Sequence, residues 1–267
     1  MSDEALLALA RETAHQAAAL IRERRPSGRV DVAATKSSPT DAVTEVDTAA
    51  ERLIRECIGA ARPGDGFVGE EGGRQPGTSG VDWVIDPIDG TVNFVYGVPA
   101  YAVSIGVEID GVVRAGVIVD VPLDREYTAV LGEGSWRRDG AGGPATPMRV
   151  PNTADLTQAL VGTGFGYDPE QRARQAEAVA ALLPQVRDIR RIGSAALDLC
   201  SMADGRYDAY VEEGLQAWDR AAGVLVAREA GAVVTGLLED EPDERLVIAA
   251  GPALFERFRA LVAECGF

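Results

Sequence analysis

Residues 83–94 read Trp83-Val84-Ile85-Asp86-Pro87-Ile88-Asp89-Gly90-Thr91-Val92-Asn93-Phe94. An apolar run typical of a buried strand ends at Ile85, and two aspartates follow it, three residues apart, with Pro87 in the turn between them. Gly90 and Thr91 then stand where a helix can begin and offer backbone N–H groups to an anion. Carboxylates beside an anion site require cations between them. The stretch therefore predicts a phosphoester site that contains Mg²⁺.

The charge of Asp86 itself points to a metal. A five-residue run that should be buried precedes it, and no lysine or arginine occurs between Val81 and Tyr101 to neutralise it. A bound cation would meet that need. Taken singly, Asp86 or Asp89 could also be a helix N-cap.

Composition limits the possible partners. The 267 residues include 42 acidic and 26 basic side chains, for a net charge of −16. This balance argues against nucleic acid or an anionic membrane as a partner. No apolar run approaches the roughly 20 residues that span a bilayer. The first residues lack the pattern of a signal peptide, and the three cysteines are too widely spaced for a disulfide or zinc framework, so we expect a cytoplasmic protein.

Hydrophobic periodicity predicts a mixed architecture. Helical spacing occurs over residues 4–25, 42–60, 169–183, 195–203 and 217–230, and again from Pro252 onward. Strand patterns occur near residues 67–68, 102–109, 112–121, 126–131, 159–162, 186–192 and 246–250, and the second to fourth of these resemble an antiparallel meander. Residues 140–147 are a loop tip or a small hairpin. The pattern indicates an α/β or α+β layered fold, and because no simple βαβ alternation is visible, a plain Rossmann sheet is the weaker interpretation.

Two further acidic segments are candidates for the metal site. Glu70 and Glu71 stand between glycines, where adjacent acids are usually just solvated. Asp219, in residues 218–223, is equally suited to capping the helix that follows. Spacing along the chain does not bring these segments to residues 83–94.

Four motifs together resemble the inositol monophosphatase family of Mg²⁺-dependent, lithium-sensitive phosphatases. They are Gly69-Glu70-Glu71, residues 83–94, Gly193-Ser194-Ala195-Ala196 and residues 218–223, in the family's order and spacing over nearly the whole chain. The resemblance implies a layered αβαβα fold, with residues 1–267 forming one catalytic domain of two closely packed halves that meet near residue 150. It also implies a homodimer.

The resemblance implies a set of metal ligands as well. Glu70, Asp86 and the backbone carbonyl of Ile88 would hold one Mg²⁺, and Asp86, Asp89 and Asp219 would hold a second. A weaker third ion would bind through Glu70. Oxygen ligands without histidine or cysteine suit Mg²⁺ rather than zinc.

The resemblance also implies which residues take part in the reaction. Thr91, supported by Asp47, would work with Glu70 to orient the attacking water. The N–H groups of Gly90 and Thr91 would bind the phosphate oxygens. One ion would lower the pKa of a bound water, and the other would stabilise the leaving alkoxide.

The resemblance is less specific about which residues bind the alcohol part of the substrate. The substrate-binding positions would be Asp89, Gly193, Ser194, Ala195, Glu212 and Asp219, together with the phosphate contacts at Gly90 and Thr91. A carboxylate accepts hydrogen bonds from vicinal diols, which suits Glu212. Glu213 stands next to it, so the choice between the two stays open. Lys36 could close over the site or simply be a solvated loop lysine.

These residues predict hydrolysis of inositol 1-phosphate or a similar polyol phosphate. Histidinol-phosphate phosphatase, fructose-1,6-bisphosphatase and phosphoadenosine phosphatase are the enzymatic alternatives within the superfamily. A binding or regulatory protein without turnover is the alternative from another class. The intact set of Glu70, Asp86, Asp89, Thr91 and Asp219 argues against it, because a pure binder has no need of groups that activate water.

Overall fold

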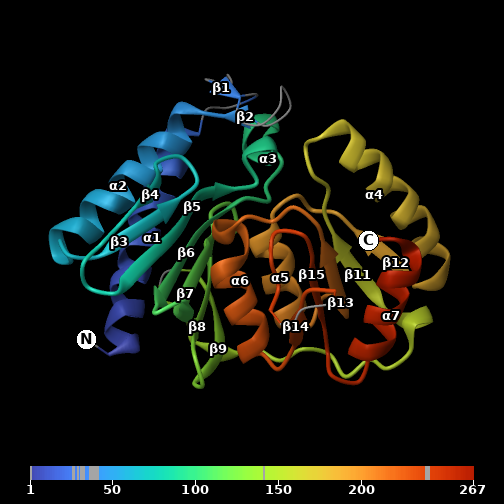
Figure 1. Cartoon of the computed structure of the whole chain (residues 1–267). Coiled ribbons are helices and arrows are strands. Elements are labelled where there is room, and N and C mark those ends of the chain that lie inside the picture. Colours follow the sequence, from blue (N-terminus) through green and yellow to red (C-terminus); the bar gives the residue numbers. More distant parts are fainter. Residues whose placement is uncertain are drawn as a thin grey trace.

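Two β-sheets alternate with three layers of helices (Figure 1). The structure is a computed structural model, and it describes residues 2–25, 28, 30, 34–35, 42–140, 142–237 and 241–267. Helices α1 and α2 cover the outer face of the first sheet, α5 and α6 lie between the sheets, and α4 and α7 cover the outer face of the second (Figure 1). The predicted αβαβα layering is therefore confirmed.

The first sheet has eight strands in the order β10-β9-β8-β7-β6-β5-β3-β4. Strands β5, β6, β7, β8 and β9 pair antiparallel in that order, which confirms the predicted meander. Strand β10 pairs antiparallel with β9, so the small hairpin is confirmed as well. The strands are β3 (Gly66–Gly69), β4 (Gly73–Gln75), β5 (Val81–Asp89), β6 (Ala102–Ile109), β7 (Val112–Asp120), β8 (Arg125–Val130), β9 (Gly134–Asp139) and β10 (Thr146–Pro147).

Helix layers bury both faces of this sheet, which explains the nearly continuous apolar sequence of β5. On one face, α1 (Asp3–Arg24) and α2 (Glu45–Ala61) pack their alanine and isoleucine stripes against Trp83 and Ile85. On the other, α6 (Ala217–Glu229) approaches closely. A Cβ on Gly116 would lie 3.1 Å from the Cα of Ala222, so a side chain there would push the helix off the sheet.

The second sheet has five strands in the order β12-β11-β13-β15-β14. Strand β11 runs parallel to both β12 and β13, and α4 and α5 form the connections. The expectation that the chain lacks βαβ alternation is therefore wrong for this half. The strands near residues 159–162 and 186–192 were predicted, but the third, Ala209–Glu212, is too short to give a clear periodic signal. The elements are β11 (Leu160–Thr163), α4 (Pro169–Leu182), β12 (Asp188–Arg190), α5 (Ala195–Ala203), β13 (Ala209–Glu212), β14 (Val233–Thr235), β15 (Val247–Ala250) and α7 (Phe255–Cys265).

Several predicted boundaries shift for local reasons. Helix α2 begins at Glu45 rather than at residue 42, because the hydroxyl of Thr44 accepts from the N–H groups of Val46 and Asp47 and caps the helix. Residues Ala42–Val43 instead form β2, antiparallel to β1 (Ala34–Thr35). The remaining short elements are α3 (Thr91–Tyr96) and the 3₁₀ turns η1 (Leu156–Gln158) and η2 (Leu183–Gln185). Lys36 and most of the loop around it lie outside the described residues. None of the helices in the described part of the chain is both long enough and apolar enough to cross a bilayer.

Candidate active site

An irregularity in β5 brings Asp86 and Asp89 to the same side of the sheet. In a regular strand, residues three apart point to opposite faces. Here Asp86 pairs with Ser104 and Asp89 with Ala102, so two residues of β5 oppose one of β6. This bulge reverses the alternation once. Pro87 is one of these two residues and has no N–H to lose from the ladder, so the turn expected at Pro87 is in fact a bulge within the strand.

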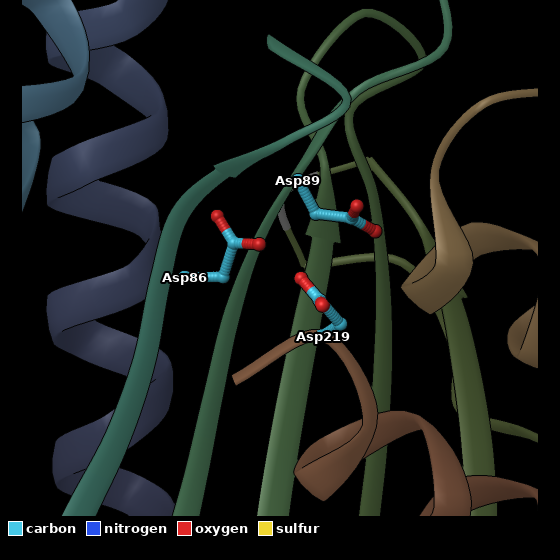
Figure 2. A group of neighbouring side chains, drawn as sticks. All are labelled: Asp86, Asp89 and Asp219. Carbon is cyan, nitrogen blue, oxygen red and sulfur yellow. The ribbon is translucent and has the colours of Figure 1, made fainter. Parts of the chain in front are cut away.

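Asp219 completes a cluster of three aspartates. Oxygen atoms of Asp86, Asp89 and Asp219 all lie within 4.8 Å of one another (Figure 2). Asp219 is the third residue of α6, and its Oδ2 accepts from the backbone N–H of Gln216 at 2.7 Å. The alternative that Asp219 caps this helix is thus correct in part: Gln216 is the N-cap, and the Asp219 carboxylate reaches back from the first turn to accept from its N–H in a capping box.

Glu70 lies beside this cluster because β3 and β5 run parallel. Gly69 is in register with Ile85, and the N–H of Glu70 donates to the carbonyl of Ile85 at 3.2 Å. Parallel strands end at the same edge of a sheet. Glu70 comes directly after β3, and Asp86 comes directly after the apolar part of β5, so the two residues lie side by side at that edge. Both side chains line one cavity.

The cluster carries uncompensated negative charge. Asp86 is 1% exposed and Asp89 7% exposed. Burial, followed by the negative charges of Glu70, Asp89 and Asp219, raises the pKa of Asp86 well above its usual range, and burial with the charge of Asp89 does the same to the pKa of Asp219. In the part of the chain that the structure describes, no lysine or arginine forms an ion pair with these three aspartates. Several buried oxygen donors of like charge fit a divalent cation with hard-ligand preference.

Thr91 and Asp47 form a buried pair next to the cluster. The Thr91 hydroxyl lies 3.0 Å from Oδ1 of Asp47 and 3.0 Å from the carbonyl oxygen of Ile88, and it can donate to either. Asp47 is fully buried in α2, and its other oxygen accepts from the N–H of Thr44 at 3.0 Å and from the Thr44 hydroxyl. The helix cap thus holds the carboxylate that faces Thr91.

Asp89 also joins the two halves of the molecule. Its Oδ2 accepts from the hydroxyl of Ser194 at 2.6 Å and from the N–H of Ala196 at 2.7 Å, at the first turn of α5. Burial nevertheless raises the pKa of Asp89 above its usual value, against the lowering effect of these two bonds. Ser194, predicted to contact substrate through its backbone, therefore has its side chain engaged with Asp89.

These groups line a cavity of about 510 Å³. Gly90, Thr91, Gly193, Ser194 and Ala195 lie on its wall beside the acidic cluster. Among the described residues, its lining includes the single cationic side chain of Arg191 and seven carboxylates, from Glu70, Asp86, Asp89, Asp168, Glu212, Glu213 and Asp219. Apart from Asp47, which lies behind Thr91, all the predicted site residues meet at this cavity.

Comparison with known proteins identifies the family. The sequence profile of the inositol monophosphatase family matches residues 2–266. Inositol-1-monophosphatase SuhB of Mycobacterium tuberculosis is 47% identical over 96% of this chain and 92% of its own length. The chain belongs to the inositol monophosphatase family. It is thus a phosphatase, and the family is metal-dependent.

A solved structure and a second relative are also similar to this chain. The solved structure of Mycobacterium tuberculosis SuhB superimposes with a TM-score of 0.84 at 44% identity, covering 99% of this chain and 98% of that one. Nus factor SuhB of Pasteurella multocida is 40% identical over 80% of this chain and 82% of its own length.

The wall of the phosphatase's cavity also includes the two adjacent glutamates, Glu212 and Glu213. Glu212 ends β13, its Oε2 accepts from the Tyr210 hydroxyl, and burial raises its pKa to about 7. Oε2 of Glu213 accepts from Nε2 of Gln175 at 3.2 Å. Both glutamates line the cavity, so position alone does not choose between them.

Motif reasoning missed the segment between β11 and α4. Phe165, Tyr167 and Gln171 line the cavity, although no motif marks them. The glycines at 164 and 166 were a usable signal: an added Cβ at Gly164 would overlap the Glu212 carboxylate, and one at Gly166 would overlap Gln171. Closely spaced glycines at the end of a strand often indicate such close approach.

Proposed function

We propose that this phosphatase hydrolyses inositol 1-phosphate or a similar polyol phosphate with the help of Mg²⁺. The convergence of Asp86, Asp89 and Asp219 oxygens within 4.8 Å on the wall of a 510 Å³ cavity carries the proposal. Such a cluster suits a phosphate ester only when cations lie between the two sets of negative charge.

The residues fit Mg²⁺ in donor type and charge. Glu70, Asp86 and the carbonyl of Ile88 would hold one ion, and Asp86, Asp89 and Asp219 a second, with a third bound more weakly through Glu70. When bound, the ions would supply Lewis-acid stabilisation of the developing negative charge and lower the pKa of a coordinated water. Four carboxylates opposite two divalent ions cancel formally, so the site becomes receptive to an anion. Lithium is expected to compete at the position formed by the three aspartates.

The protein's own groups would align the reactants. When the Thr91 hydroxyl donates to Asp47, its lone pairs are left to accept from an attacking water, and Glu70 would accept the water's second proton. The N–H groups of Gly90 and Thr91 would bind phosphate oxygens. Gly90 adopts a φ of 98°, and a Cβ there would lie 2.9 Å from the carbonyl oxygen of Ala100, so only glycine permits this backbone.

The charge of the cavity supports a substrate with one phosphate. Fructose 1,6-bisphosphate and phosphoadenosine compounds bring a second phosphate, which would face several carboxylates, with Arg191 the one cationic side chain among the described residues of the lining. A neutral polyol offers hydroxyl donors to those same carboxylates. Histidinol phosphate, with its ammonium group, remains the nearest competitor.

Phosphate release from a panel of esters tests this proposal. We expect kcat/KM for inositol 1-phosphate to exceed that for histidinol phosphate, fructose 1,6-bisphosphate and phosphoadenosine phosphate by about 10-fold or more, with activity lost on chelation and restored by Mg²⁺. Preference for any of the other three would overturn the substrate assignment while leaving the reaction class intact.

Replacing Glu212 by glutamine tests recognition of the alcohol. The amide has one acceptor oxygen where the carboxylate has two, so kcat/KM for inositol 1-phosphate should fall about 10-fold. Hydrolysis of p-nitrophenyl phosphate, which has no hydroxyls to recognise, should be unchanged. Glu213→Gln is the matched control, and a larger loss in that variant would assign the role to Glu213 instead.

A binding role without turnover is the second candidate, because Pasteurella multocida Nus factor SuhB is among the relatives. The complete set of acids and the Thr91–Asp47 pair favour turnover. A homodimer, a cytoplasmic location and a single catalytic domain over residues 1–267 stay predictions; Cys57, Cys200 and Cys265, all free thiols, support the location.

A further inference from the structure

Asn93 is a buried side chain of the central motif whose role the mechanism leaves open. It lies in α3, two residues after Thr91, and is 7% exposed. A buried side-chain amide needs hydrogen-bond partners, and its choice of partners reveals what it holds.

All the partners of its amide nitrogen are backbone carbonyls near the cavity. Nδ2 donates to Ile192 at 2.7 Å and to Ala100 at 2.8 Å, with a longer contact to Gly193 at 3.3 Å. Two N–H groups serve three acceptors, so the contact with Gly193 is the weakest. A carboxylate of the same shape could not replace the amide, because it offers no donor.

These contacts cross between the two halves of the molecule. Ala100 precedes β6 of the first sheet, whereas Ile192 and Gly193 precede α5 of the second half. Gly193 has a φ of 88°, and a Cβ on it would lie 3.0 Å from Nδ2 of Asn93. The loop of residues 192–194 therefore rests directly on the Asn93 amide.

The same loop delivers Ser194 to Asp89. Ser194 follows Gly193, and its hydroxyl donates to Oδ2 of Asp89 at 2.6 Å. We propose that Asn93 is a positioning residue that sets the Gly193–Ala195 backbone for the alcohol part of the substrate. It acts on the leaving-group side of the cavity, and its own amide nitrogen donates to none of the proposed metal-ligand side chains. This inference rests on the proposed phosphatase function.

Comparing two substrates separates positioning from general structural damage. In Asn93→Ala, kcat/KM for inositol 1-phosphate should fall about 30-fold, mostly through KM, because the loop loses the bond to Ile192 and the longer contact to Gly193. For p-nitrophenyl phosphate, the loss should stay within about threefold, since its alcohol makes no hydroxyl contacts. Mg²⁺ binding measured by calorimetry should match the wild type. Asn93→Asp should behave like the alanine variant, and Asn152→Ala, at an exposed loop asparagine, is the matched control.

Equal losses on both substrates, weaker Mg²⁺ binding, or no loss on either would overturn the positioning role. If Asn93→Ala does not fold by circular dichroism, Asn93→Ser, which keeps one donor, is measured in its place and judged by the same ratio. If the wild type prefers another ester of the panel, the proposed substrate fails, and that ester replaces inositol 1-phosphate in the comparison.

Discussion

Asp86→Asn is expected to remove almost all turnover while making the metal-free protein more stable. The carboxylate would bridge two ions, and losing it should reduce kcat by about 10³-fold, equivalent to several kcal/mol of charge stabilisation. Phosphate release at saturating Mg²⁺ measures this loss. A variant that retains a tenth of wild-type activity would exclude Asp86 as a shared ligand.

The stability gain follows from the sign of the pKa shift. Burial and the neighbouring carboxylates raise the pKa of Asp86 in the folded state, so its ionised form opposes folding at neutral pH. Asparagine removes that charge, and thermal unfolding in chelator should shift upward by about 2–4 °C. The gain should be present above the unfolded-state pKa of aspartate and vanish at lower pH, where both states are protonated. A lower unfolding temperature at neutral pH would contradict this.

Asp65→Asn is the matched control, with the opposite expected effect on stability. Asp65 is 4% exposed, but Arg62 donates to it at 2.7 Å and the indole of Trp83 at 2.9 Å. Although burial acts in the other direction, these bonds and that of Ser79 lower its pKa, so its charge stabilises the fold. Asp65→Asn should cost about 1–3 kcal/mol of unfolding free energy and leave kcat unchanged.

Thr91→Val is expected to reduce kcat by about 10²–10⁴-fold with little change in KM. Valine has nearly the same shape but no hydroxyl, so the link from Asp47 to the attacking water is lost. Single-turnover phosphate release isolates this step from product dissociation. Thr91→Ser keeps the hydroxyl and should stay within about 10-fold of the wild type.

Combining Thr91→Val with Asp47→Asn tests whether the two residues act as one unit. If they do, the double variant should be scarcely slower than Thr91→Val alone. Multiplicative losses would show that Asp47 acts independently of Thr91. Because Asp47 also caps α2 through Thr44, its variant should lose about 1 kcal/mol of unfolding free energy as well.

Local sequence was sufficient to predict most elements of this protein. Helical spacing located α1, α4, α5 and α6, and turn residues located the meander, because these signals arise between residues a few positions apart. Strands β11 and β12 were predicted, whereas β13 and β14 were missed, since three or four residues do not establish a period. The start of α2 was predicted too early for a different reason: Thr44 caps the helix, and Ala42–Val43 before it form β2.

Residue types by themselves predicted the chemistry of the site: acidic oxygens without histidine or cysteine, next to a glycine that allows a sharp backbone, favour Mg²⁺ and phosphate as the proposed ligands. The resemblance to the family indicated which acidic segments form the site together, whereas their spacing along the chain did not.

Only the tertiary structure decided how these segments come together in space. The bulge at Pro87 turns Asp86 and Asp89 to one side, and parallel β3 and β5 place Glu70 beside them. The packing of α6 against the first sheet brings Asp219 from 130 positions further along the chain. Asn93 stood in the opening motif with no assigned partner, because two of its three acceptors lie on a loop about 100 residues away and become its neighbours only when both halves pack together.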